Sequence, residues 1–173
     1  PDQGRTVNLL ALLYEKDGHF KEANNHLINF LPYRADISHL LYRIGRNFIF
    51  LKENNKSFMH WQRLLRLSTD KEFWALKVFA LVHSPELLAQ FMPILKPVTK
   101  ISPKLATLLS RRLFEQDRSA QAFSILSKIP VNKKFYKAQL FRADKLRINK
   151  QFKKASQVLD ALAKVHPQNE IRP

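Results

Sequence analysis

Residues 45–61, GRNFIFLKENNKSFMHW, hold the pattern that decides the fold: a small residue, another twelve positions later, and a large apolar residue four positions after that. In this stretch the three positions are Gly45, Ser57 and Trp61. The spacing recurs at Ala11/Ala23/Leu27, Ser110/Ala122/Leu126 and Ala143/Ala155/Leu159. The second set follows the first by 34 residues and the fourth follows the third by 33, whereas the second and third are 65 apart. Such recurrence indicates a repeat protein.

The segments around each set have the periodicity of amphipathic helices. In residues 5–17 and 20–31 the apolar side chains fall on one face at helical spacing, and Asp17-Gly18 between them is a turn signal. Glycine is scarce, and no long stretch alternates polar with apolar residues, so strands find little support. The sequence therefore predicts helices near residues 5–17, 20–31, 38–51, 55–67, 69–82, 103–116, 119–129, 133–148 and 151–165, and a further helix that starts at residues 84–86.

Helix-start signals divide the middle of the chain. Thr69 and Glu72 have the spacing of a capping box, in which a hydroxyl and a carboxylate satisfy end-of-helix amides. Residues 84–86 and 102–103 each place serine before proline, as an N-cap followed by proline in the first turn. We also expect Pro93 and Pro97 to kink or shorten the helix between these starts.

These residues resemble the tetratricopeptide repeat family, whose 34-residue units carry a Leu-Gly step, a tyrosine, an alanine and a closing proline. The first unit matches at Leu10-Ala11, Tyr14 and Ala23, and the second at Ile44-Gly45 and Ser57. The later matches are Leu109-Ser110, Ala122, Ala143, Ala155 and Pro167. The small positions let the two helices of a pair cross closely. Residues 70–98 fit only as a helix pair, and the alternative to the resemblance is another α-solenoid or bundle.

The resemblance implies an all-α, right-handed α-solenoid of antiparallel helix pairs. It divides one domain, residues 1–173, into units at about 4–37, 38–69, 70–101, 102–132 and 133–167. The register places Pro1 at the closing proline of a preceding repeat, and residues 169–173 at the start of a following one. We therefore expect the chain to be an excised part of a longer array, with neighbouring repeats among its partners.

In this family the first helix of each pair lines a concave face that binds peptides or subunits, and basic groups there suit an acidic peptide. The resulting groove residues are Tyr42, Arg46, Phe50, Lys104, Arg111, Phe114, Lys137 and Arg147. Further first-helix positions expected to turn outward are Asn8, Leu12, Glu15, His39, Ile49, Thr107, Leu140 and Asp144. A set of Lys and Asn residues that holds chaperone carboxylates in some members is not reproduced, since only Asn8 has a place in it.

Positive charge is concentrated in the C-terminal half. The net charge is +16, and residues 1–95 carry 12 basic and 9 acidic side chains against 18 and 5 in residues 96–173. A field of this kind attracts anionic partners. We expect a basic patch at Lys133, Lys134, Lys150, Lys153 and Lys154.

The sequence contains no convincing catalytic or metal-binding motif. We therefore predict that the protein is not an enzyme and has no cofactor or metal site. Residues 68–71 match a serine–lysine hydrolase spacing, but helix capping explains them better. The six histidines never pair with a carboxylate at metal-ligand spacing, and the glycosylation triplet 55–57 places its serine at a packed position. Cysteine is absent, which excludes disulfides, and no apolar run is long enough to span a membrane.

Three functions remain open. The first is a protein-interaction scaffold that binds a peptide or subunit, acidic in character, through the first-helix face. The second is binding of a polyanion, either nucleic acid or acidic polysaccharide, by the basic half, where Phe135, Tyr136, Phe141 and Phe152 could stack on bases. The third is a periplasmic repeat module of a bacterial exopolysaccharide export protein. The sequence is compatible with the periplasm or the cytoplasm, and the absence of cysteine favours the bacterial periplasm.

Overall fold

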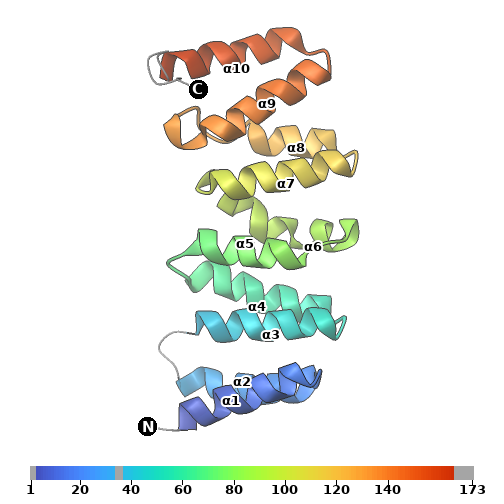
Figure 1. Ribbon diagram of the computed structural model, residues 1–173, viewed down its shortest axis with the longest axis vertical. Helices are drawn as coiled ribbons and strands as arrows, with labels where there is room; N and C mark the ends of the chain where they lie inside the picture. Colours follow the sequence, from blue (N-terminus) through green and yellow to red (C-terminus); the bar gives the residue numbers. More distant parts are fainter. Residues whose placement is uncertain (1–2, 34–36, 166–173) are drawn as a thin grey trace. The chain divides into compact units, whose positions relative to one another are not determined.

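The computed structural model describes residues 3–33 and 37–165, and these residues form helices and connecting turns without a strand (Figure 1). The expectations for Pro1 and residues 169–173 fall outside this range. By its contacts the chain divides into two compact units, unit 1 (Pro1–Ile94) and unit 2 (Leu95–Pro173). No described helix is long and apolar enough to cross a membrane.

The α-helices follow the predicted ranges to within a few residues. Unit 1 contains α1 (Gln3–Lys16), α2 (Phe20–Phe30), α3 (Ser38–Phe50), α4 (Asn54–Leu67), α5 (Lys71–Leu81) and α6 (Pro85–Leu95, ending at the unit boundary). Unit 2 contains α7 (Pro103–Glu115), α8 (Ser119–Leu126), α9 (Tyr136–Ile148) and α10 (Phe152–Val165). Short 3-10 helices are η1 (Leu31–Tyr33), η2 (Lys96–Lys100) and η3 (Lys133–Phe135).

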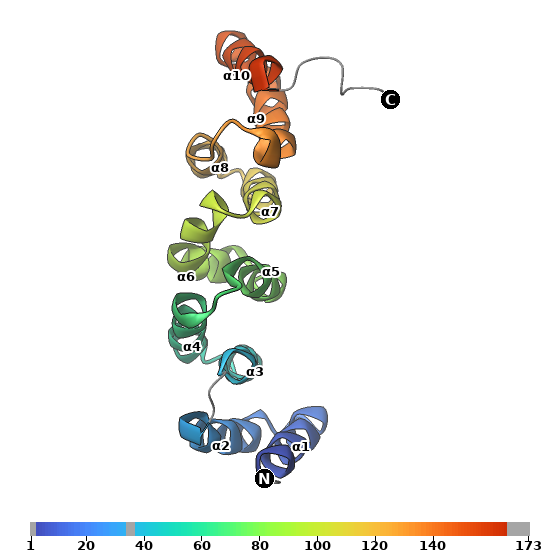
Figure 2. The ribbon, with the colours of Figure 1, turned by 90° about the vertical axis from the view of Figure 1, so that its left-hand side faces the viewer.

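Neighbouring helices pack as pairs. In unit 1 α1 packs on α2 and α3 on α4, while α2 contacts α3 and α4 contacts α5. In unit 2 α7 packs on α8 and α9 on α10, and α9 also contacts α7 and α8. Within unit 1, α1, α3 and α5 lie on one side and α2, α4 and α6 on the other; within unit 2, α7 and α9 lie opposite α8 (Figure 2). The predicted fold class, an all-α solenoid of antiparallel helix pairs, is confirmed.

The small positions lie where the helices of each pair cross. Ala11, Ala23, Ser57, Ser110 and Ala122 have no exposed surface, and the remaining small positions are also buried. At Gly45 a Cβ would lie 2.8 Å from Trp61 Cε2 and closer still to Nε1 and Cδ1, so the indole occupies the space of a side chain. The indole N–H donates to the Tyr42 carbonyl at 3.1 Å. The spacing read from the sequence is therefore a helix-crossing register.

One large residue of the pattern is exposed. Leu27, Trp61 and Leu126 have no exposed surface, but 46% of Leu159 is accessible. Leu159 lies on α10, and no further helix follows α10 among the described residues. The register therefore buries a large residue only where the next pair covers it.

The helix starts confirm two of the three expected caps. Ser84 Oγ accepts from Leu87 N at 3.1 Å, and Ser102 Oγ accepts from Leu105 N at 3.0 Å. The capping box at Thr69 was wrong: α5 begins at Lys71 with Asp70 as N-cap, whose Oδ1 accepts from Phe73 N at 3.0 Å. An ionised carboxylate accepts an amide hydrogen bond more strongly than a hydroxyl does and is favoured at the positive end of the helix dipole.

The two prolines end α6 as predicted. Pro93 lies inside α6, which stops two residues later at Leu95. The chain continues as the 3-10 helix η2, with Pro97 in its first turn. A proline has no N–H for the helical ladder and clashes with the preceding turn, so two prolines four positions apart end the α-helix.

Candidate partner-binding surface

A hollow of about 480 Å³ opens in unit 2 where α7 and α9 begin. We call it the lysine slot. The residues that line it are Pro103, Lys104, Thr107, Leu108, Lys133, Lys134, Tyr136 and Lys137. The slot brings together two sets that the sequence kept apart, since Lys104 and Lys137 are predicted groove residues whereas Lys133 and Lys134 belong to the predicted basic patch.

Local hydrogen bonds fix the two walls of the slot. On one wall Ser102 caps α7, and Pro103 follows in the first turn. On the other, Asn132 Oδ1 accepts from Phe135 N at 3.1 Å and starts η3, while Phe135 is only 2% exposed. Gln139 donates from Nε2 to the Ile129 carbonyl at 2.9 Å and ties the preceding loop to α9. The lysines therefore extend from anchored backbone.

The slot is electrostatically one-sided. Four exposed lysines line it, and none of the residues that line it is acidic. Because α7 and α9 both begin here, the positive ends of two helix dipoles add to this field. On the same helices Glu115 lies at the far end of α7, and Asp144 bonds Arg147 at 2.9 Å. The lining of the slot thus contains four ammonium groups and no carboxylate.

Further along the same face a cation–π cluster joins α7 to α9. The rings of Phe114 and Phe141 meet edge to face with centroids 5.8 Å apart. Lys145 Nζ lies 5.5 Å from both centroids, and Arg111 Cζ lies 5.9 Å from that of Phe141. Two predicted groove residues, Arg111 and Phe114, therefore take part in packing between these helices.

The predicted basic patch is divided between the two ends of α9. Lys133 and Lys134 lie at the slot, whereas Lys150, Lys153 and Lys154 lie at the turn into α10. The 13 residues of α9 separate the two groups by roughly 20 Å. Lys154 Nζ donates to Gln151 Oε1 at 3.2 Å. These groups act as separate positive regions, because salt screens charges this far apart.

The predicted groove residues of unit 1 are engaged by neighbours. Arg46 Nη2 lies 2.7 Å from Glu15 Oε2. The Tyr42 ring lies 5.4 Å from Trp74 and 6.3 Å from Trp61, and burial raises the pKa of its hydroxyl, opposed by the charge of Arg46. Phe50 stacks on Phe20 at 4.7 Å yet remains 51% exposed.

Glu15, expected to turn outward, is buried at 9% exposure and forms the centre of a polar network. Besides Arg46, it accepts from Arg43 Nε at 3.1 Å and from Asn47 Nδ2 at 2.9 Å. Asn47 also donates to Asn24 Oδ1 at 3.0 Å. The correction has a physical cause: two guanidinium groups on α3 hold the carboxylate inside. Arg43, Asn24 and Asn47 were missed, although polar residues beside Ala23 and Gly45 were a usable signal.

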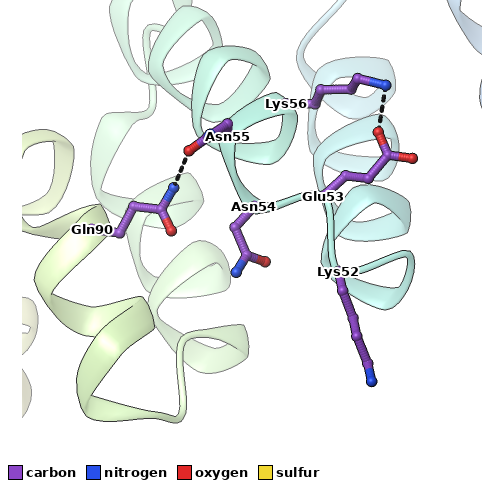
Figure 3. A pocket seen from close by; sticks show the side chains of 6 residues that line it. All are labelled: Lys52, Glu53, Asn54, Asn55, Lys56 and Gln90. Atoms are coloured by element: carbon purple, nitrogen blue, oxygen red, sulfur yellow. Dashed lines mark hydrogen bonds and ion pairs between the residues drawn. The ribbon is translucent and has the colours of Figure 1, made fainter.

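Unit 1 has a second hollow, of about 430 Å³, at the start of α4 (Figure 3). Gln90 Nε2 donates to Asn55 Oδ1 at 2.8 Å, and Lys56 forms an ion pair with Glu53. Lys52 and Asn54 extend away from these pairs in Figure 3. This hollow differs from the lysine slot because acidic and amide side chains lie in its lining and bond neighbouring lining residues.

The structure also bears on two motifs from the sequence, the serine–lysine spacing at residues 68–71 and the aromatic ring of Phe135. Residues 68–71 connect α4 to α5: Ser68 is the C-cap of α4, and its Oγ accepts from Asp70 N, the N-cap of α5, at 3.1 Å, so helix capping explains their spacing. Phe135, one of the rings considered for base stacking, is buried beneath Lys134 and has no open face for a base. Among the described residues no three His, Asp or Glu side chains gather as a metal site would require.

Comparisons with known proteins bear on the fold. No protein-family model matches the sequence, and no curated protein matches it. A solved structure described as "MamA RS-1 ArsTM double mutant" superposes on this chain with a TM-score of 0.53. The superposition covers 99% of each chain, and the two sequences are 11% identical. MamA contains tetratricopeptide repeats. At this identity the likeness concerns the fold alone, and it supports a tetratricopeptide-like helical-repeat fold for this chain.

Proposed function

We propose that this protein is an interaction scaffold that binds an acidic segment of a partner protein at the lysine slot. The observation that carries the proposal is the slot itself, with four lysines around one hollow between two first helices. A volume of about 480 Å³ lies within the 300–1,000 Å³ range common for ligand pockets. Helical-repeat proteins use such faces for gripping partners.

Binding at a defined site and attraction by the whole basic half predict different effects of mutation on affinity. Complementary charge at a defined site fixes register and orientation, so position matters as well as net charge. A polyanion such as nucleic acid or acidic polysaccharide binds through many phosphate or carboxylate contacts, and its affinity follows total charge and salt. An export module that bound an acidic polysaccharide would show the second behaviour.

A charge-matched pair of variants tests this proposal. Lys104→Glu/Lys137→Glu changes two slot residues, and Lys150→Glu/Lys153→Glu makes the same charge change at the far end of α9. A fluorescein-labelled peptide rich in Glu and Asp is titrated at about 0.15 M salt and read by anisotropy. We expect the slot variant to weaken binding at least about tenfold and the control by no more than about threefold.

The competing outcome is equally clear. Equal losses in the two variants, with heparin and an oligonucleotide binding as tightly as the peptide, contradict a defined site. Such a result favours polyanion binding by the whole basic half. A steep loss of affinity with salt for every probe would accompany it.

A further inference from the structure

The geometry points to a two-part ligand for the lysine slot: one bulky apolar side chain that enters the hollow, flanked in the partner's chain by carboxylates. This inference rests on the proposed function and names the acidic segment more closely. It concerns how the slot selects one acidic protein segment over another. Charge alone provides little such selection.

The inner surface of the slot is the first argument. Pro103, Leu108 and the ring of Tyr136 line it, and the surface of the hollow is mainly apolar. The methylene stems of Lys104 and Lys137 extend this surface, since lysine keeps only its ammonium group in water. A ligand made of charge alone would leave the apolar walls exposed to water. A large apolar side chain would cover them, at a gain of about 25 cal/mol for each Å² buried.

The placement of the lysines is the second argument. Lys104 comes from α7, whereas Lys133, Lys134 and Lys137 come from η3 and the first turn of α9, so ammonium groups stand on both walls. An apolar group between the walls brings its neighbours in the peptide to the rim on either side. Interfaces commonly have this form, with one buried anchor surrounded by polar contacts.

The cation–π cluster sets a limit to the apolar part. The rings of Phe114 and Phe141 are already packed against each other and against Lys145, and Arg111 covers Phe141. The α7–α9 face beyond the slot therefore offers mainly cationic groups to a ligand. One anchor, with further carboxylates extending along this face, fits the surface better than a series of apolar residues.

Peptides of equal charge test the inference. The probes are Glu-Asp-Phe-Asp-Glu and Glu-Asp-Gly-Asp-Glu, each labelled and acetylated, with the intact chain as receptor. We expect the Phe peptide to bind at least about tenfold more tightly than the Gly peptide. Leu108→Asn should abolish this preference, while Leu140→Asn, on α9 outside the slot lining, should preserve it. Circular dichroism checks that both variants fold.

A second variant protects the test against misfolding of Leu108→Asn. Thr107 is half-buried at the slot, and Thr107→Phe should fill the hollow, lowering the affinity of the Phe peptide to that of the Gly peptide. Equal affinities of the two peptides for the unmodified protein, with Lys104→Glu/Lys137→Glu still weakening both, overturn the anchor and leave the proposed function standing. Binding of both peptides that is indifferent to those lysines overturns the proposed function itself.

Discussion

Unit 1 and unit 2 share one helix-pair register, but they treat their charged side chains in opposite ways. In unit 1 Glu15 lies buried between Arg43 and Arg46, and amide groups complete its contacts. In unit 2 four lysines surround an open hollow whose described lining contains no carboxylate. Both units bury small residues where helices cross. The difference shows that the repeat determines the fold and that the surface residues of each unit determine what it can bind.

We expect the largest change in stability from a substitution of Glu15, the centre of the polar network in unit 1. Glu15→Ala leaves two largely buried guanidinium groups without their carboxylate, and we expect the free energy of unfolding to fall by about 3 kcal/mol. Both tryptophans, Trp61 and Trp74, lie in unit 1, so fluorescence during urea denaturation reports on this unit. Glu22→Ala removes an exposed carboxylate from the same unit as a control. Equal shifts in the two variants would show that the network adds no stability.

The next largest effect concerns the helix crossing. Gly45→Ala places a methyl group in the volume of the Trp61 indole, which is buried and bonded to the Tyr42 carbonyl. We expect a loss of about 2 kcal/mol, because overpacking forces a rigid buried ring to move. Tryptophan fluorescence in urea measures it. A loss below about 0.5 kcal/mol would mean that the two helices separate easily at this point.

The sequence predicted the helix-crossing positions better than it predicted the contacts of the charged surface residues. Ala23 and Ser57 were assigned to packing from spacing alone, since a repeated small residue has few other physical causes. Arg46 was placed in a groove, yet it bonds Glu15, because a one-dimensional pattern does not show which charges meet across two helices. The sequence predicted part of the slot, because the family resemblance implied that Lys104 and Lys137 lie on the first-helix face. Its other lysines come from η3, whose position depends on the Asn132 cap.

A smaller effect tests whether the shared register behaves alike in both units. Ser57 Oγ and Ser110 Oγ are buried and bond no partner in the described structure. Replacing an unsatisfied buried hydroxyl removes a desolvation penalty. We expect Ser57→Ala and Ser110→Ala to leave the free energy of unfolding unchanged or raise it by up to about 1 kcal/mol. Fluorescence follows the first variant and circular dichroism the second. A loss in one unit alone would reveal a difference in packing at the crossing.

The smallest effect is a pH dependence confined to unit 1. His60 stacks on Phe48 at 5.5 Å, and burial, reinforced by the charge of Arg63, lowers its pKa. In the unfolded chain His60 has a pKa of about 6.5, so as the pH falls His60 is protonated in the unfolded chain before it is protonated in the folded one.

The contribution of neutral His60 is complete above that value and declines as the pH drops from about 6.5 through the lower pKa of the folded state. Urea midpoints from tryptophan fluorescence should fall over this window, and less in His60→Gln. The exposed His83 offers the matched variant His83→Gln, which should keep the decline of the unmodified protein. If His60→Gln declines as steeply as His83→Gln, another group in unit 1 controls its response to acid.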